Sequence, residues 1–334
     1  MFHRLLPICG LVPLLLVGCA HWTPEPDSPP SLPPMHSILN TPVIDGDTGQ
    51  PITVEALAAK WRDADVVVIG ELHGHNGAHL LEARMQAALY AEHPDQVLSL
   101  EPFNVDHQPE LDQYLAGKLG EAEMIEDAEA WENYRAGYRP LVTFAAELGL
   151  PVVAANAPTL AVRCVGREGP TALDRLDPDL QALLPKQPFL SDPNYRERFF
   201  AAMGGHGSGS GGDNPLENRY KAQLLRDNTM ASRILQALKA HPGAQVLHVT
   251  GVFHSEGRLG TVALLQARDP DLKIRVLTPV TVSNPTHPTY GADDLSGGDA
   301  VYLLAPLPPE YVDQSRMIDA IRQQFADARD MECP

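Results

Sequence analysis

The chain has 334 residues, and 43 acidic against 25 basic side chains give it a formal net charge of −18 at pH 7. Such an acidic chain disfavours nucleic acid as a partner, because proteins that bind nucleic acid carry basic patches. The length is sufficient for one large folded domain after the N-terminal segments are set aside.

Residues 1–18 have the pattern of a signal peptide rather than of a folded element. A short basic region precedes an apolar stretch that is too short to span a membrane as a mature helix. Residues 16–19 match the lipobox of bacterial lipoproteins, which implies cleavage before Cys19 and acylation of that residue, with palmitate for example. The alternative is an ordinary secretory signal in which Cys19 stands by chance. No aspartate follows Cys19, which favours an anchor in the outer membrane, facing the periplasm.

Residues 19–41 are rich in proline, so we predict a tether that holds the domain off the membrane. We place a single α/β domain at 42–334, with a turn at 44–49 and a helix at 54–61. The acidic residues of the turn lack the complete pattern of an EF-hand loop.

The strongest local signal is a predicted strand at 66–69 that runs directly into polar side chains. Four β-branched residues in succession are typical of a strand buried on both faces, as in a parallel sheet. Gly70 ends this run, and a helix is predicted from residue 78. The titratable residues that follow the strand are Glu71, His73, His75 and His79.

Three further predicted strands end in the same way. Strand 97–100 leads to Glu101, with Pro102 expected to stop the strand. Strand 152–155 leads to Asn156, and strand 246–250 leads to His254. Ligands of open α/β sheets bind outside the carboxyl ends of the strands. If the strands are parallel, these endings converge on one edge of the sheet. Asn156 is equally compatible with bracing its own turn.

Helices dominate the middle of the sequence. Arg135 precedes a helix that starts near Pro140, and it is free to pair with a haem propionate, a substrate carboxylate or Glu101. We predict a helical insertion at about 159–239. It contains a glycine-rich loop at 204–212, in which His206 is either a surface residue or a haem contact.

The C-terminal part is predicted to hold a strand at 273–277, an edge strand at 300–304 and an amphipathic helix at 310–328. Cys164 and Cys333 remain in the mature chain. They are candidates for a disulfide, but the sequence does not show whether they lie close enough. There is no CxxCH motif, so any haem is bound non-covalently.

These features resemble the ChaN family of haem-binding lipoproteins, which is grouped with the TIKI and TraB proteins and, more distantly, with erythromycin-esterase-like enzymes. The resemblance extends over 64–277. It rests on an ordered set of residues: 70–73, Glu101, 134–135, 156–158, Gln223, Asp227, 230–231 and 251–254. It implies an α/β fold and haem binding linked to iron uptake, and some relatives in the wider group are metal-dependent hydrolases.

We therefore expect an α/β fold with a mostly parallel sheet flanked by helices. Glu71, His73, Glu101 and His254 should share one pocket, with Arg135 and Asn156 nearby. Such residues suit a divalent metal such as zinc, general acid/base catalysis, or a buried polar network in which every partner is satisfied.

The leading functional hypothesis is a haem-binding envelope lipoprotein in iron acquisition, and thus not an enzyme. The alternative is a metal-dependent or acid/base hydrolase, and a scaffold without ligand is a third class. The resemblance implies a tyrosine ligand to haem at a dimer interface. The candidate haem contacts are Tyr138, Tyr195, Tyr220 and His206. No tyrosine follows a strand, so we expect the haem and the Glu/His cluster to occupy separate sites.

Overall fold

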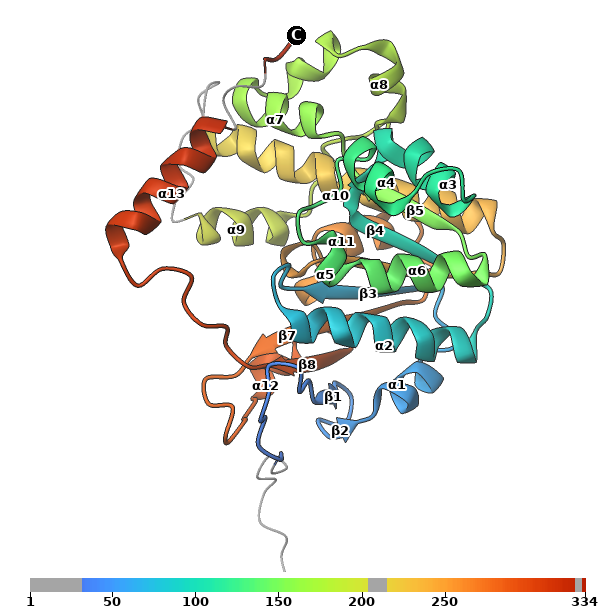
Figure 1. The fold of residues 1–334 in the computed structure, drawn as a ribbon, viewed down its shortest axis with the longest axis vertical. Helices are drawn as coiled ribbons and strands as arrows, with labels where there is room; N and C mark the ends of the chain where they lie inside the picture. The colour runs from blue at the N-terminus through green and yellow to red at the C-terminus, as the bar shows by residue number, and fades with distance from the viewer. Residues whose placement is uncertain (1–31, 204–214, 328–331) are drawn as a thin grey trace, which may run out of the picture.

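The computed structural model describes residues 32–203, 215–327 and 332–334. Its centre is an eight-stranded sheet in the order β2-β1-β8-β7-β3-β6-β4-β5. Helices lie against the sheet, and the helix α13 stands at the margin of the molecule, away from the sheet (Figure 1).

Six of the strands, β3 to β8, run parallel, and β1 is antiparallel to both of its neighbours. The mostly parallel sheet is the predicted one. The strand bounds are β1 Val43–Asp45, β2 Pro51–Ile52, β3 Val66–Glu71, β4 Gln96–Asn104, β5 Val152–Asn156, β6 Gln245–Gly251, β7 Ile274–Thr281 and β8 Ala300–Leu304.

The β-branched run of β3 is buried on both faces because side chains alternate across a strand. Val67 and Ile69 belong to the core on one side of the sheet, together with residues of α1, α2 and α6. Val66 and Val68 belong to the core on the other side, with residues of α10 and α11. The fold is therefore three-layered, with helices on both faces of the sheet.

Helices connect most of the strands and pack on both faces of the sheet. Proline in the first turn starts α6, and Gly149 ends it in the left-handed conformation, at φ 67°. The bounds are α1 Val54–Lys60, α2 Asn76–Glu92, α3 Gln108–Leu115, α4 Glu121–Asp127, α5 Tyr134–Gly137, α6 Arg139–Leu148, α7 Thr159–Glu168, α8 Pro178–Leu183, α9 Pro193–Ala202, α10 Pro215–Ala240, α11 Thr261–Arg268, α12 Ala292–Leu295 and α13 Gln314–Asp327.

Two predictions about strands were wrong. The strand predicted to stop before Pro102 continues to Asn104, because its register against β5 shifts between Leu100 and Asn104. A register shift interrupts the hydrogen-bond ladder, and this is where a strand tolerates proline. The predicted edge strand, β8, instead lies between β7 and β1, and the two-residue β2 forms that edge.

The packed body begins earlier than the predicted domain start at residue 42. Leu32 and Met35 are buried in a core that includes Ile44 and Val301, and the backbone N–H of Met35 donates to the carbonyl of Pro285. The last part of the predicted tether, 32–41, therefore lies against the domain. Residues 1–31, with Cys19, and the loop that holds His206 lie outside the described residues.

The segment between β5 and β6 contains the helices α7 to α10, in the region of the predicted insertion. Cys164 on α7 forms a disulfide with Cys333, with 5.6 Å between the Cα atoms. This bond ties the C-terminal segment that follows α13 to α7. No helix in the described ranges is long and apolar enough to cross a membrane.

Candidate functional site

The carboxyl ends of β3, β6 and β4 bring the predicted residues to one edge of the sheet. Glu71 is in register with Gly251 across the β3–β6 pair. Leu100 is in register with Val249 across the β4–β6 pair, so Glu101 follows at the same level. Two hydrogen-bonded networks meet here, and we call them the Glu71 network and the Glu101 network.

The Glu71 carboxyl is hydrogen-bonded on one oxygen only. Its Oε1 lies 2.7 Å from Nδ1 of His73, and it accepts a 2.5 Å hydrogen bond from the hydroxyl of Tyr138. Its Oε2 makes no hydrogen bond, although Nδ1 of His79 lies 3.2 Å away. Burial by itself raises the pKa of Glu71, but the neighbouring imidazoles of His73 and His79 outweigh it and hold this pKa well below its usual range.

His79 and Glu82 lie one turn apart on α2 and complete the Glu71 network. Nδ1 of His79 lies 3.0 Å from Oε2 of Glu82, and its Nε2 donates to the backbone carbonyl of His73 at 2.8 Å. Burial alone lowers the pKa of His79, but Glu71 and Glu82 outweigh it and raise this pKa to about 10. Burial and the charge of Glu71 raise the pKa of Glu82 well above its usual value.

The Glu101 carboxylate accepts two hydrogen bonds on one oxygen and lies near an imidazole on the other. Its Oε2 accepts from the hydroxyl of Thr250 and from the backbone N–H of Gly251, both at 2.7 Å. Its Oε1 lies 3.5 Å from Nε2 of His254. Burial raises the pKa of Glu101, but His254, His73 and these donors outweigh it, and the net shift is downward.

His254 is held between two carboxylates. Its Nδ1 lies 2.8 Å from Oδ1 of Asp227 on α10, which also accepts from Thr261 at 2.9 Å. The other oxygen of Asp227 accepts from the hydroxyl of Tyr195 at 2.7 Å. Burial lowers the pKa of His254, but Asp227 and Glu101 outweigh it and raise this pKa. The chain Asp227–His254–Glu101 therefore fixes the orientation of the imidazole.

His73 lies between the two networks and is the accessible imidazole. Its side chain is 45% exposed, and its ring meets the edge of Trp131 with 4.8 Å between centroids. A Cβ on Gly251 would stand 2.7 Å from Nε2 of His73 and 3.6 Å from Oε2 of Glu101. Glycine at 251 thus lets the His73 ring lie beside the Glu101 carboxylate.

Other predicted residues lie at the margin of the site. Arg135 is exposed and pairs with Glu121 at 3.5 Å, rather than with Glu101. Asn156 is buried at the end of β5, where its Oδ1 accepts from the backbone N–H of Ala157 at 2.9 Å. This is the turn-bracing contact that we weighed against a ligand role.

The three tyrosines predicted to contact haem are buried, and each hydroxyl has a partner. Tyr138 donates to Glu71 and Tyr195 donates to Asp227, whereas the hydroxyl of Tyr220 lies 2.5 Å from that of Ser191. Tyr138 and Tyr195 are thus joined to the two networks, because α5–α6 and α9 pack over the carboxyl edge. That haem and the Glu/His cluster occupy separate sites stays a prediction.

The sequence predicted no role for four residues that hold these networks together, among them Gln223, whose Nε2 donates to the hydroxyl of Tyr195 at 3.2 Å. Glu82 and Thr250 were not singled out, and Asp227 and Gln223 appeared only as part of the family pattern. A weak signal existed for Glu82, since it lies three residues after His79 on a predicted helix, and such residues meet on one helix face. Nothing in the sequence indicated that α10 aims Asp227 at His254.

The structure arranges the four predicted metal ligands as two pairs, Glu71 with His73 and Glu101 with His254. A tighter set consists of Glu71, His79 and Glu82. Their ligating atoms all lie within 4.8 Å of one another, and all three side chains are buried.

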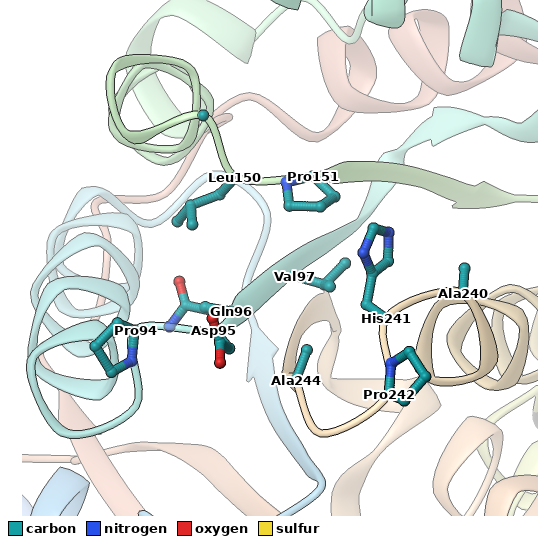
Figure 2. Close-up of a pocket in the computed structure, with 11 residues that line it drawn as sticks. Pro94, Asp95, Gln96, Val97, Leu150, Pro151, Ala240, His241, Pro242 and Ala244 are labelled. Carbon is teal, nitrogen blue, oxygen red and sulfur yellow. The ribbon is translucent and has the colours of Figure 1, made fainter.

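A pocket of about 600 Å³ lies at the opposite edge of the sheet, where β4 and β6 begin. Figure 2 shows that prolines and small apolar side chains line much of it, with His241 reaching in from the end of α10. Because it lies at the amino ends of these strands, the pocket is separate from both networks, which lie at the carboxyl ends.

Comparison with known proteins gives a family and a fold. The model of a family described as haem-binding uptake, Tiki superfamily, ChaN matches residues 57–265. ChaN of Campylobacter jejuni, whose structure is described as showing cofacial haem binding, superposes with a TM-score of 0.55 at 17% identity. The match covers 79% of this chain and 96% of that chain.

Weaker structural matches have lower TM-scores. An erythromycin esterase in its open conformation gives a TM-score of 0.44 at 14% identity, over 84% of this chain and 87% of that one. The effector domain RRSP of a Vibrio vulnificus MARTX toxin gives a TM-score of 0.38 at 19% identity. That match covers 68% of this chain and 36% of that one. A comparison with curated proteins finds no match.

Proposed function

The chain belongs to the ChaN family of haem-binding uptake proteins in the Tiki superfamily, and from this we propose that it binds haem non-covalently and serves haem or iron acquisition. The observation that carries the proposal is the family match over residues 57–265. The likeness to a Campylobacter jejuni protein described with cofacial haem binding supports it.

We further propose that the protein is a lipoprotein of the bacterial envelope, anchored through Cys19 to the outer membrane and facing the periplasm. The lipobox at 16–19 supports the anchor. The disulfide between Cys164 and Cys333 supports an oxidising compartment, since disulfides persist there and are rare in the cytosol. Radiolabelled palmitate in the wild-type protein, absent from a Cys19→Ser variant, is the expected result. Equal labelling of both would contradict it.

The surface that best suits a flat apolar ring is the C-terminal apolar segment, which we define as residues 307–321. Half of the large apolar side chains that are exposed in the described chain lie there: Leu307, Tyr311, Val312, Met317, Ile318 and Ile321. Exposed apolar patches mark ligand or protein contacts. Arg316 is exposed in the same segment, and its guanidinium is suited to a haem propionate.

Haem titration of the purified protein tests the haem proposal. We expect a saturable shift of the Soret band at a fixed stoichiometry. Unsaturable binding, with the spectrum of free haem, would contradict it. Light scattering with and without haem tests the accompanying proposal of a homodimer, for which we expect the mass to double at the stoichiometric point.

Tyrosine variants locate the haem. Tyr138, Tyr195, Tyr220 and His206 remain candidates, and the structure adds Tyr311, which is 41% exposed, whereas the other three tyrosines are buried. Tyrosinate oxygen is a known axial ligand of haem iron. We expect Tyr311→Phe to weaken haem binding and His73→Ala to leave it nearly unchanged. Weakening by Tyr195→Phe or Tyr220→Phe instead would place the haem at α9 and α10. If only His73→Ala abolished haem binding, the haem would lie at the strand ends.

A second candidate function, acid/base hydrolysis, is favoured by the orientation of two imidazoles at one carboxyl edge. His73 is accessible and bonded to Glu71, and His254 is bonded to Asp227 next to Glu101. His73 is placed to remove a proton from water. The negative charge of Glu101 is placed to stabilise the positive charge that then develops on the imidazole of His73. Ester and peptide panels test this. Turnover abolished by Glu71→Gln supports hydrolysis, and turnover unchanged in that variant argues against it.

A further inference from the structure

Three buried side chains behind the strand ends converge on one point, where two carboxyl groups share a single imidazole. Nδ1 of His79 lies 3.0 Å from Oε2 of Glu82 and 3.2 Å from Oε2 of Glu71. Two carboxyl groups therefore face one ring nitrogen. Glu71 Oε2 and Glu82 Oε1 make no hydrogen bond, although both side chains are at most 1% exposed.

The other ring nitrogen of His79 decides which lone pair is free. Its Nε2 lies 2.8 Å from the backbone carbonyl of His73, and a carbonyl accepts but never donates. Nε2 therefore carries a proton in either form of His79, and Nδ1 is the atom that shares a proton or a metal ion with the two carboxyl groups. A metal ion at this point would take the place of the proton on Nδ1 and bind both carboxyl groups in their charged form, because metal ligands bind deprotonated.

The remaining contacts are those that typically support a metal site. Histidines that bind metal usually donate their second N–H to a carbonyl or carboxylate, as His79 does. The Oε1 of Glu71 is already bonded by Tyr138 and His73, which orients the carboxylate and leaves Oε2 for another ligand. The same carbonyl of His73 also accepts from Asn133 at 2.5 Å, which fixes its position.

We propose that Glu71, His79 and Glu82 bind a divalent first-row transition-metal ion such as Zn²⁺ through Oε2, Nδ1 and Oε2. One imidazole with two carboxylates suits this class of ion. Two carboxylates also neutralise a divalent cation, so the buried site carries no net charge. The separations of 3.0 and 3.2 Å are close to those between neighbouring ligands about 2.0–2.2 Å from zinc.

This site differs from the one that the sequence suggested. Glu71 belongs to both sets, but His73, Glu101 and His254 do not bind the ion here. The inference does not depend on haem binding, since it rests on side chains of β3 and α2 alone. The ion would hold the carboxylate of Glu71 in place. Because His73 and Tyr138 are both bonded to the other oxygen of Glu71, their rings would be held in place as well.

Zinc titration of the chelator-treated full-length protein tests the proposal, with calorimetry and metal analysis as readouts. We expect one Zn²⁺ per chain and at least a tenfold loss of affinity in Glu82→Gln. Glu101→Gln is the matched control, because it changes a buried carboxylate of the neighbouring network, and it should bind like the wild type. No stoichiometric Zn²⁺ in the wild type would overturn the proposal, and so would an equal loss in Glu101→Gln.

X-ray absorption of the zinc-loaded wild type needs no variant and covers the case in which Glu82→Gln fails to fold. We expect a single imidazole among nitrogen and oxygen ligands, because His79 alone supplies nitrogen. Two imidazoles would place the ion between His73 and His254 and would overturn the assignment.

Discussion

The two networks at the carboxyl edge differ in how their buried carboxylates are compensated. In the Glu101 network, three of the four oxygens of Glu101 and Asp227 take part in hydrogen bonds, and the fourth lies 3.5 Å from Nε2 of His254. In the Glu71 network, one nitrogen of His79 serves two carboxyl groups, and two oxygens have no hydrogen bond. Fully satisfied polar networks make a core rigid, whereas partly satisfied ones are costly. The difference separates a region that orients His254 from one in which two buried carboxyl groups share a single imidazole.

Removing Asp227 should have the largest effect and would break the satisfied network. Asp227→Ala leaves His254, Tyr195 and Thr261 without their acceptor, so we expect a loss of about 3–5 kcal/mol in the free energy of unfolding. Urea denaturation measures it. The control Asp63→Ala, at an exposed position, should change this free energy by less than about 0.5 kcal/mol. A loss below about 1 kcal/mol in Asp227→Ala would mean that the three donors find other acceptors.

Acid should weaken the region behind the Glu101 network. Burial lowers the pKa of His248 on β6 to about 4. The unfolded chain binds a proton at this histidine near its usual pKa of about 6.5, so stability falls as the pH drops from 6.5 to 4, by up to about 3 kcal/mol. Denaturation across this range measures the slope, and His248→Gln should flatten it. The same slope in both proteins would exclude His248 as the cause.

Paired tyrosine variants should sharpen the comparison with smaller effects. Each removes one hydroxyl donor from a buried carboxylate. Asp227 keeps two other partners after Tyr195→Phe, whereas Glu71 keeps one hydrogen bond after Tyr138→Phe. We expect losses of about 1 kcal/mol for Tyr195→Phe and about 2 kcal/mol for Tyr138→Phe in metal-free protein. A larger loss for Tyr195→Phe would reverse our ranking of the two networks.

The smallest expected loss of stability comes from a substitution at Gly251, which lies between the ring of His73 and the carboxylate of Glu101. In Gly251→Ala, the added methyl would stand 2.7 Å from His73 Nε2, and the half-exposed ring can swing outward. We expect less than about 1 kcal/mol of lost stability. The emission of Trp131, whose ring touches His73, should change with the swing. A crystal structure with His73 in place would contradict this.

The sequence was sufficient where a pattern is local. The β-branched run of β3 and the titratable residues after it predicted a buried parallel strand and an edge site, and the structure has both. The pattern failed where a partner is remote in sequence. Asp227 acts on His254 only because α10 packs over β6, and Tyr138 reaches Glu71 only through the turn between α5 and α6. We predicted β8 as an edge strand because β1 and β2, which lie beyond it in the sheet, are too short to give a periodic signal in the sequence.

The sheet order has a consequence for synthesis. β3 lies between β6 and β7, which begin at Gln245 and Ile274, so neither neighbour exists when β3 leaves the ribosome. At about 5–20 residues per second, the wait for β6 is roughly 10–35 seconds. Such non-local pairing also slows folding, because a long loop must close first. Glu101 therefore acquires Thr250, Gly251 and His254 among the last steps, and a nascent chain that stops before β6 carries the residues of the Glu71 network without the Glu101 network.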